Sequence, residues 1–247
     1  AANKLIADWV AGKIAEVVKD PVIADKLTPK TYPFGTKRLC VDTGYYQVYN
    51  RDNVTLVDIN DTPIERITAT GIRTSAGDHS CDAIIFALGF DAMTGTLGKI
   101  AITGRGGLTL AEKWADGPVT NLGLMIAGFP NFFTITGPGS PSVLTNMVMS
   151  IEQHVDWIAD AIAYLGARQL ATIETTEAAE AAWVAHVAEV ADTTLYPLAN
   201  SWYMGANVPG KPRVFLPYIG GFPAYVEACD AVAAAGYDGF RLEPLAA

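Results

Sequence analysis

Two adjacent cations mark the first segment that could bind an anion. Lys37 and Arg38 end a loop over residues 32–38, in a chain of 247 residues that holds only 17 Lys and Arg. In the same loop Gly35 supplies a flexible backbone and Thr36 a hydroxyl, so charge and hydrogen-bond donors stand together. The loop is a candidate anion site, although on spacing alone an ordinary solvated pair of surface cations is the commoner meaning of such a sequence.

The segment 200–213 is the second candidate. It combines the indole N–H of Trp202 with amide side chains, two glycines and the cations Lys211 and Arg213. No hydrophobic periodicity runs through it, and loops that carry such donors often bind ligands. We interpret it as a functional loop, with a purely structural loop as the alternative.

A glycine- and proline-rich turn, residues 137–142, joins two hydrophobic segments. The run 132–136 before it predicts a short buried strand. After the turn, apolar residues recur every three or four positions, as in an amphipathic helix: Val143, Met147, Ile151, Val155, Ile158, Ile162 and Leu165. Ser140 is a plausible N-cap and Pro141 suits the first helical position. Unpaired N–H groups at such a helix start suit the electron-rich edge of a cofactor, and a tight connection without a ligand is the alternative.

The composition argues against several function classes. Half of the residues are hydrophobic, which is enough for a sizeable core in one or two domains. The net charge of −9 argues against nucleic acid or an anionic membrane surface as the main partner. No run of about eighteen apolar residues predicts a membrane span, and the first residues lack the pattern of a secretory signal. The three cysteines, Cys40, Cys81 and Cys229, have no close pairing, and the three histidines are scattered, so we expect neither a disulfide framework nor a metal site. We interpret the cysteines as core thiols and expect a reducing, cytoplasmic setting.

Several helices are expected to position these segments. An amphipathic helix is predicted over residues 1–19, and because no capping residue precedes it, we expect the natural N-terminus upstream. Further helical segments are predicted as a short turn up to residue 27, an aromatic face at 45–49, a helix from Thr175 or Thr176 to residue 190, and a helix over 222–235 ended by Gly236. His154 and His186 stand singly on helical faces, which favours packing over metal binding or catalysis.

The expected strands complete an α/β fold. Residues 64–70 and 71–74 predict a hairpin, and residues 54–59 a further strand. The apolar runs 81–90 and 122–128 are typical of strands buried within an α/β sheet. Between them, residues 91–120 are expected to cross between domains, with a short element at 108–114. Such sheets bind ligands beyond the carboxyl ends of their strands.

Five segments together resemble one known family, the type I Baeyer–Villiger monooxygenases. They match its C-terminal half in order and at matching separations over essentially all 247 residues. The five segments are Pro33-Phe34-Gly35-Thr36-Lys37-Arg38, Phe86-Ala87-Leu88-Gly89-Phe90-Asp91-Ala92, Gly128-Phe129-Pro130-Asn131 through Gly137-Pro138-Gly139-Ser140-Pro141-Ser142, Ser150-Ile151-Glu152-Gln153-His154, and Ser201-Trp202-Tyr203 through Gly210-Lys211-Pro212-Arg213.

This resemblance implies part of a flavoprotein fold, with Rossmann-like halves of two dinucleotide-binding domains plus helices. The implied domains are the end of a helical insert at 1–35, the second part of the NADPH domain at 36–90, and the second part of the FAD domain at 91–247. In the family, NADPH reduces FAD, O2 adds to give a C4a-peroxyflavin, and the peroxide attacks a ketone to give an ester or lactone. The expected substrate is a cyclic or aryl-alkyl ketone.

Individual roles follow from the resemblance, position by position. Arg38 matches the catalytic arginine, whose permanent charge would stabilise developing negative charge on oxygen. Lys37 matches the lysine that helps recognise the 2′-phosphate of NADPH. Trp202 matches the tryptophan whose indole N–H contacts the nicotinamide nucleotide.

Four further residues match the bulge and helix start beside the flavin ring. The resemblance implies cofactor contacts for Ser142 and Met147. It implies a substrate pocket lined by Val143, Leu144 and Met147, where family members differ in substrate range.

Two departures from the family pattern matter. Leu88 stands where the family usually has a threonine between alanine and glycine, so a hydroxyl is lost at the end of that strand. The larger departure is that no Gly-x-Gly-x-x-Gly occurs in the chain, whereas the family carries two such phosphate-binding fingerprints in its N-terminal half. The expected partner is therefore the missing N-terminal half or a companion chain that supplies it.

Two other functions stay open. The chain could be part of a related flavin monooxygenase that oxygenates nitrogen or sulfur instead of a ketone. It could also be a non-catalytic folded remnant that lacks the N-terminal cofactor-binding half.

Overall fold

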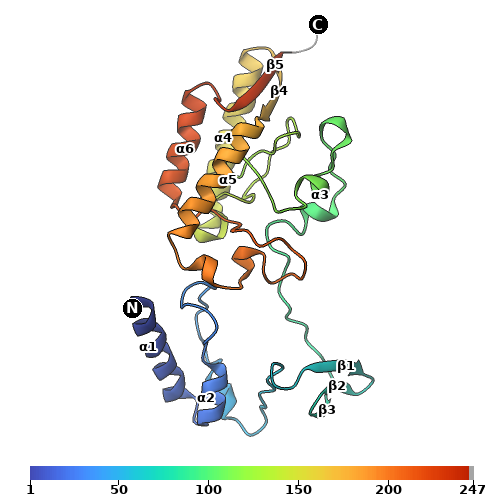
Figure 1. Cartoon of the computed structure of the whole chain (residues 1–247), viewed down its shortest axis with the longest axis vertical. Helices are drawn as coiled ribbons and strands as arrows, with labels where there is room; N and C mark the ends of the chain where they lie inside the picture. The colour runs from blue at the N-terminus through green and yellow to red at the C-terminus, as the bar shows by residue number, and fades with distance from the viewer. Residues whose placement is uncertain (245–247) are drawn as a thin grey trace. The chain divides into compact units, whose positions relative to one another are not determined.

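The computed structural model describes residues 1–244 and divides into two compact units, Ala1–Gly89 and Phe90–Ala247. Helices and strands occur in both units, which confirms the mixed α/β class (Figure 1). The finer division into three domains at 1–35, 36–90 and 91–247 stays a prediction. Among residues 1–244, no helix combines the length and the apolar character needed to cross a bilayer.

The first unit begins with two helices at the places that the sequence predicts, α1 (Ala2–Val17) and α2 (Pro21–Leu27). The carboxylate of Asp20 caps α2, because it accepts hydrogen bonds from the N–H groups of Val22 (2.8 Å) and Ile23 (3.3 Å). The expected aromatic helix is only a short 3-10 helix, η1 (Gln47–Asn50). A small core joins these elements, with Ile14, Val18, Ala24, Tyr46 and Tyr49 among its members.

A three-stranded antiparallel sheet completes the first unit. It consists of β1 (Ile64–Thr68), β2 (Gly71–Thr74) and β3 (Gly77–Ser80), paired in that order. The predicted hairpin is confirmed by the pairing of Thr68 with Gly71. The strand β3 was not predicted, because its short polar sequence has no hydrophobic alternation.

Two strands predicted in this part of the chain are wrong. Residues 54–59 and 81–90 form no strand. The second segment leaves its apolar side chains in solvent: Ile85 is 91%, Leu88 86% and Phe90 88% exposed. Their composition suits a buried strand, but no neighbouring strand among residues 1–244 pairs with them.

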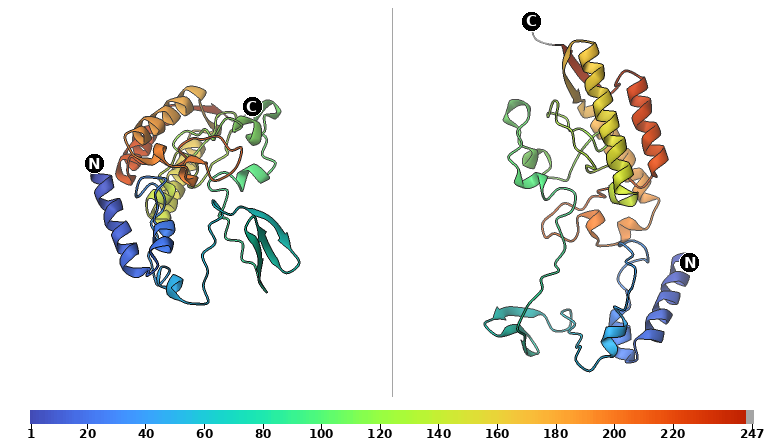
Figure 2. Two further views of the ribbon diagram at one scale, coloured as in Figure 1. Left: turned by 60° about the horizontal axis from the view of Figure 1, so that its bottom comes forward. Right: turned by 180° about the vertical axis from the view of Figure 1, so that it is seen from behind.

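The second unit is built on three long helices and one pair of strands. The helices are α4 (Met147–Ala167), α5 (Glu177–Asp192) and α6 (Phe222–Ala234), and α4 lies beside α6 (Figure 2). The antiparallel strands are β4 (Leu170–Thr175) and β5 (Phe240–Pro244). The shorter elements are α3 (Leu110–Lys113), η2 (Leu97–Lys99), η3 (Arg105–Gly107), η4 (Ser142–Leu144), η5 (Tyr196–Leu198) and η6 (Trp202–Met204).

Local capping predictions in this unit are confirmed. The side chain of Thr176 caps α5 by accepting the N–H of Ala179 at 3.2 Å. Gly236 follows the end of α6 with φ 74°, a left-handed conformation that glycine adopts without strain. Thr109 and Glu112 form a capping box at α3, within the predicted short element.

The start of α4 differs from the prediction. Ser140 is not its N-cap, because its hydroxyl donates to the carbonyl oxygen of Gly137 at 2.7 Å. Residues 142–144 form η4, and the extended backbone of Thr145 (φ −131°, ψ −174°) separates it from α4. The N-cap is Asn146, whose side chain accepts the N–H of Val148 at 3.0 Å.

The apolar stripe that predicts α4 mostly faces outward. Met147 is 36%, Ile151 37%, Val155 44% and Ile162 57% exposed. A different face packs into the core of the unit, and it carries Ser150, His154, Trp157, Ala161 and Leu165. The helix is thus apolar on two sides, which is typical of a helix buried between two layers.

Neither of the apolar segments 122–128 and 132–136 forms a strand. The first is buried, whereas in the second only Thr134 is buried and Ile135 is 47% exposed. Leu124, Met125 and Ile126 are each 0% exposed, while their pairings are only isolated bridges. Left-handed backbone conformations at Leu122 (φ 57°) and Thr136 (φ 54°) interrupt the extended path. The predicted burial is therefore confirmed for residues 122–128 and wrong for residues 132–136, and the predicted strands are wrong in both segments.

The cysteines do not all behave as core thiols. Cys229 is buried, as expected, but Cys40 and Cys81 are exposed. Both lie in coil segments of the first unit.

Candidate functional site

The turn 137–142 is shaped by glycines that have no room for a side chain. A Cβ at Gly137 would lie 2.5 Å from the carbonyl oxygen of Gly123. Gly139 has φ 82°, and a Cβ there would lie 3.1 Å from Thr120 Oγ1 and 3.2 Å from Trp183 Nε1. These positions need glycine because backbone and side chains approach closely.

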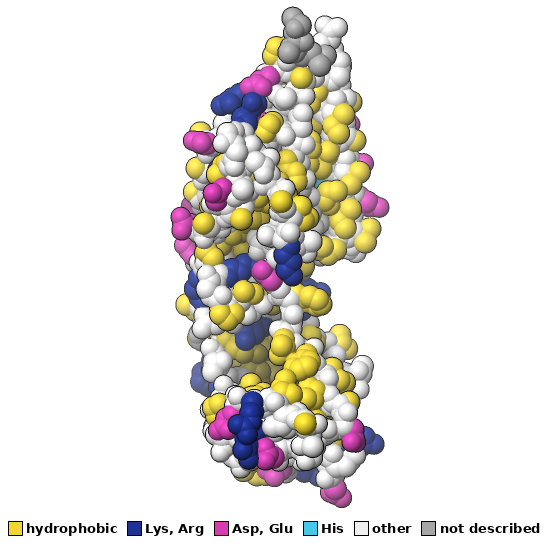
Figure 3. Space-filling model, turned by 90° about the vertical axis from the view of Figure 1, so that its right-hand side faces the viewer, with side chains coloured by type: hydrophobic (Ala, Val, Ile, Leu, Met, Phe, Trp, Pro, Cys, Tyr) yellow, Lys and Arg dark blue, Asp and Glu magenta, His cyan; other side chains and the backbone are white. Residues whose placement is uncertain are grey.

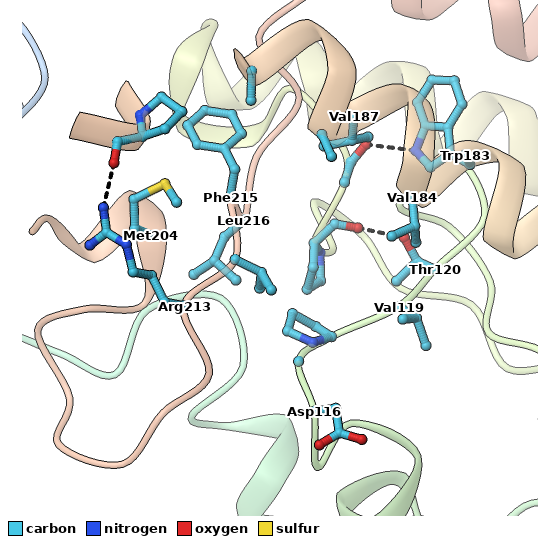
Figure 4. Close-up of a pocket in the computed structure, with 18 of the residues that line it drawn as sticks. Asp116, Val119, Thr120, Trp183, Val184, Val187, Met204, Arg213, Phe215 and Leu216 are labelled. Carbon is cyan, nitrogen blue, oxygen red and sulfur yellow. Dashed lines mark hydrogen bonds between the residues drawn. The ribbon is translucent and has the colours of Figure 1, made fainter. Parts of the chain in front are cut away.

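Hydrogen bonds from side chains outside the turn fix two of its carbonyl groups (Figure 4). Thr120 Oγ1 donates to the carbonyl oxygen of Pro138 at 2.6 Å, and Trp183 Nε1 donates to that of Gly139 at 2.9 Å. The N–H of Gly139 donates to the carbonyl oxygen of Leu216 at 2.7 Å, and the N–H of Ser140 to that of Gly137 at 3.1 Å. These two N–H groups are therefore already used within the chain, contrary to the unpaired donors predicted at a single helix start.

The four predicted residues of the bulge lie together at the end of this turn. Ser142 is 1% exposed and has φ 44°, a strained conformation for a residue with a side chain. Its hydroxyl contacts the sulfur atoms of Met93 (3.5 Å) and Met147 (3.9 Å). Val143 and Leu144 follow in η4 and are half-buried. The structure thus brings Ser142 and Met147 into contact.

Trp202 lies in the second unit on η6. Its ring is half-buried and stacks on Tyr203, with 3.9 Å between centroids and an interplanar angle of 30°. The stack fixes the orientation of the indole.

The two cations of the loop 200–213 are used inside the unit. Lys211 Nζ forms an ion pair with the carboxylate of Asp91 and donates to the carbonyl oxygen of Ala92 at 3.1 Å. Arg213 donates to the side chain of Asn200 and to the carbonyl oxygen of Pro197. These cations therefore shape the loop.

Lys37 and Arg38 line one cavity of about 870 Å³ in the first unit. The cavity lies between α1 and residues 29–46. Lys37 Nζ stands 4.3 Å from the ring centroid of Tyr32, a cation–π contact, and Arg38 is exposed. The hydroxyl of Thr36 is buried and donates to the carbonyl oxygen of Pro33 at 2.7 Å, so the expected hydroxyl donor is absent from the anion site.

The seven predicted site residues therefore fall into separate groups. Lys37 and Arg38 share a cavity in the first unit. The others belong to the second unit: Ser142, Val143, Leu144, Met147 and Trp202. Their assignment to cofactor, substrate and catalysis stays a prediction.

A cavity of about 350 Å³ behind the turn was not predicted (Figure 4). Its wall is mainly apolar, with Val119, Val184, Val187, Phe215 and Leu216 among the lining residues. The apolar side of α5 was visible in the sequence, but the loops that close the cavity carried no signal. None of the predicted substrate-pocket residues lines it.

Two buried carboxylates that the sequence analysis missed hold residues 127 and 128. Glu180 Oε1 accepts the N–H of Ala127 at 2.8 Å, and its other oxygen pairs with Lys113 Nζ at 2.7 Å. Glu174 accepts the N–H of Gly128 at 3.0 Å and pairs with Arg105 Nε at 2.6 Å. The bond to Glu174 raises the pKa of Arg105 above its ordinary value. These contacts replace the strand pairing that the apolar run lacks.

The part of the chain that the structure describes contains no group of three or more side chains able to hold a metal ion.

The chain is similar to several monooxygenases, although no family model matches it. It is 46% identical over 237 residues to a Baeyer-Villiger monooxygenase of Pseudooceanicola batsensis, covering 96% of this chain and 43% of that protein. It is 47% identical over 239 residues to the acetone monooxygenase (methyl acetate-forming) of Gordonia sp. (strain TY-5), covering 96% and 45%. It is 40% identical over 243 residues to a phenazine N-monooxygenase of Lysobacter antibioticus, covering 98% and 44%.

Solved structures of monooxygenases are also similar to this chain. An oxidized steroid monooxygenase bound to NADP matches with a TM-score of 0.90 and 53% identity, over 98% of this chain and 46% of that one. A closed structure of cyclohexanone monooxygenase matches with a TM-score of 0.94 and 43% identity, over 98% and 45%. The chain spans less than half the length of the relatives it matches.

Proposed function

We propose that this chain, which matches the C-terminal half of Baeyer–Villiger monooxygenases, supplies that half of an enzyme that uses FAD and NADPH. The complete enzyme would insert one oxygen atom from O2 beside a ketone carbonyl and release an ester or lactone. The observation that carries the proposal is continuous identity of 46–47% over 96% of the chain with relatives named for this chemistry. A scattered motif would not give a match of this length.

The exposed apolar surface of this chain supports the proposal that an N-terminal half of the enzyme binds to it. The outward stripe of α4 and the run at residues 84–90 are apolar enough to be buried, yet they face solvent. Hydrophobic side chains are also spread over the face that Figure 3 shows. Exposed apolar surface of this extent marks an interaction site. The N-terminal half, in the same polypeptide or in a companion chain, is the proposed cover.

The cavity of Lys37 and Arg38 fits an anionic ligand. Three cations, Lys13, Lys37 and Arg38, line this cavity together with the ring of Tyr32 and a single carboxylate, Asp42. The excess of positive charge suits a phosphate group. We assign the 2′-phosphate of NADPH to Lys37. Arg38 is the proposed catalytic residue, since an exposed guanidinium can donate to oxygen atoms that gain negative charge during the reaction.

The turn 137–142 and Trp202 supply the other proposed contacts. Bound FAD would supply the oxygen-activating chemistry, beside Ser142 and Met147. Val143 and Leu144, together with Met147, would line the pocket for a cyclic or aryl-alkyl ketone. The indole N–H of Trp202 would contact the nicotinamide nucleotide, and its stack on Tyr203 would hold it in place.

The test joins this chain to the N-terminal half of a relative, such as the acetone monooxygenase, or co-expresses the two. We expect a yellow protein that converts a ketone to an ester with NADPH. Arg38→Ala should abolish ester formation while NADPH still bleaches the flavin absorbance. A reconstituted yellow enzyme with Arg38→Ala that forms esters at the normal rate would contradict the role of Arg38.

N-oxygenation is the second candidate, because a phenazine N-monooxygenase matches at 40% identity. The same preparation should be assayed with a ketone, an amine and a sulfide. Turnover of the amine or sulfide without ketone turnover would favour this alternative. A colourless protein that binds no companion half would instead indicate a non-catalytic remnant.

A reducing, cytoplasmic compartment is part of the proposal, since the exposed thiols of Cys40 and Cys81 stay reduced there. Fractionation of the source cells would test it.

A further inference from the structure

We propose that His154 is a positioning residue that holds the turn 137–142 through one neutral tautomer. The series of hydrogen bonds that links Thr136 through His154 and Tyr225 to Leu122 does not depend on the proposed function. Its consequence for the reaction does, because the cofactor role of Ser142 at the end of the turn is part of that proposal.

The partners of the His154 ring fix where its proton lies. The backbone N–H of Thr136 donates to Nδ1 at 2.9 Å, so Nδ1 carries no proton. Nε2 lies 2.9 Å from the hydroxyl oxygen of Tyr225, and that hydroxyl donates its own proton to the carbonyl oxygen of Leu122 at 2.7 Å. Nε2 must therefore be the donor to Tyr225.

A charged ring would not fit this arrangement. Protonation of Nδ1 would place its proton against the N–H of Thr136. That N–H would lose its acceptor, and the new N–H of the ring would face a donor instead of an acceptor. The side chain is 0% exposed, and burial lowers the pKa of His154 to about 4. The ring is thus a neutral connector with one donor and one acceptor in use.

The chain of bonds ends at two residues with left-handed backbones. Thr136 has φ 54° and Leu122 has φ 57°, conformations that are rare for residues with branched side chains. Such conformations persist where surrounding contacts fix them. His154 bonds to the N–H of Thr136, and Tyr225 bonds to the carbonyl of Leu122, so α4 and α6 together hold both residues.

Thr136 is the residue directly before the turn. The far side of the turn is held by Thr120 and Trp183 at the carbonyls of Pro138 and Gly139 (Figure 4). His154 holds the near side. These contacts on both sides fix the backbone of the turn, and Ser142 at its end keeps its strained φ of 44°.

His154 acts through the turn and not by contact with a ligand. It lines none of the cavities described above, and its ring nitrogens are both bonded inside the core. It is therefore a positioning residue, and Ser142 is the residue through which its effect would reach the flavin.

Two substitutions separate its two bonds. Asn at position 154 keeps an acceptor near the place of Nδ1 and loses the donor to Tyr225. Gln reaches the place of Nε2 and keeps the donor, but loses the acceptor for Thr136. His79, an exposed histidine of β3 whose Nε2 lies 3.2 Å from Oγ1 of Thr74, provides the matched control because its partner belongs to the first unit and not to the turn.

In the reconstituted enzyme, we expect His154→Gln to lower kcat for ester formation at least tenfold and to leave the KM for NADPH unchanged. His154→Asn should retain most of the activity, and His79→Asn and His79→Gln should behave as wild type. Equal effects of the two His154 variants, whether both normal or both impaired, would overturn the positioning role.

A second measurement is independent of any activity. In ¹H–¹⁵N spectra of the 247-residue chain, Nδ1 of His154 should be unprotonated and Nε2 protonated, without change from about pH 8 to about pH 5. A protonated Nδ1 in that range would overturn the proposal. If the spectra agree but no variant of the joined enzyme makes an ester, the proposed function fails and the tautomer assignment stands.

Discussion

The indole N–H of Trp183 donates a hydrogen bond of 2.9 Å to the carbonyl oxygen of Gly139. This contact joins the middle of α5 to the glycine-rich turn, 44 positions away in sequence. Such distant contacts stabilise the shape of the turn, because the side chains of its glycine, proline and serine residues are too small to pack against one another. Its stability therefore depends on side chains that lie far from it in the chain.

Trp183→Phe should destabilise the chain by about 1–2 kcal/mol. The phenyl ring keeps much of the packing of the nearly buried indole but leaves the carbonyl of Gly139 without this donor. Urea denaturation followed by circular dichroism measures the change. Trp9→Phe is the control, since Trp9 is 59% exposed, and its free energy of unfolding should not change. Equal stability of the Trp183 variant and wild type would contradict the importance of this bond.

The sequence predicts the elements that depend on near neighbours. Thr176 caps α5 and Gly236 follows α6, because each signal needs only the adjacent turn of helix. The β1–β2 hairpin is found for the same reason. The start of α4 is missed, because Asn146 competes with Ser140 and only the backbone of Thr145 decides between them.

The errors concern elements that need distant partners. The run 81–90 has the composition of a buried strand but lacks a neighbouring strand among residues 1–244. Residues 122–128 are buried as predicted, but Glu174 and Glu180 bind their backbone where a strand would. The site residues Ser142 and Met147 could be named from the family resemblance. The contacts of the Ser142 hydroxyl with Met147 and with the distant Met93 could not be predicted.

Glu180→Ala should cost about 3 kcal/mol of unfolding free energy. The substitution leaves the N–H of Ala127 without an acceptor and removes the partner of Lys113, whose side chain is only 18% exposed. Glu180→Gln should cost less, because its amide oxygen can still accept the N–H of Ala127. Denaturant titration of both variants gives the values.

The control for Glu180 is Glu177→Ala, at the exposed first turn of the same helix. Loss of its interaction with the helix N-terminus should cost only about 0.5 kcal/mol. Similar losses for Glu177→Ala and Glu180→Ala would show that the buried pair adds no stability.

Acidification should weaken the fold through His154. Burial lowers its folded-state pKa to about 4, below the ordinary value of 6.5, so the unfolded chain binds more protons between these two values. Stability is therefore unaffected by this group above about pH 6.5. It falls as the pH decreases from about 6.5 to about 4, by about 3 kcal/mol in total.

Denaturant titrations of wild type and His154→Asn across this range isolate the effect. The difference in unfolding free energy between the two proteins should change with pH only in the window from about 6.5 to about 4. Carboxylates with lowered pKa, such as Glu112 and Glu243, contribute equally to both proteins and cancel. A constant difference would mean that the histidine is protonated alike in the folded and unfolded chains.

Val155→Asp should weaken binding of the N-terminal half while the chain itself stays folded. Val155 is 44% exposed on the outward apolar stripe of α4, so an aspartate there is solvated in the separate chain. Burial under a partner would remove that carboxylate from water, which costs several kcal/mol, and binding should weaken at least tenfold.

Co-purification with the N-terminal half of a relative measures this binding without any need for activity. Ala163→Asp is the matched control, because Ala163 is exposed on the side of α4 that carries Asp156 and Asp160. That variant should bind like wild type, since its carboxylate stays in solvent. Normal binding by Val155→Asp would mean that the outward stripe of α4 is not the contact surface. Self-association of wild type that Val155→Asp abolishes would instead assign the stripe to a second copy of the chain.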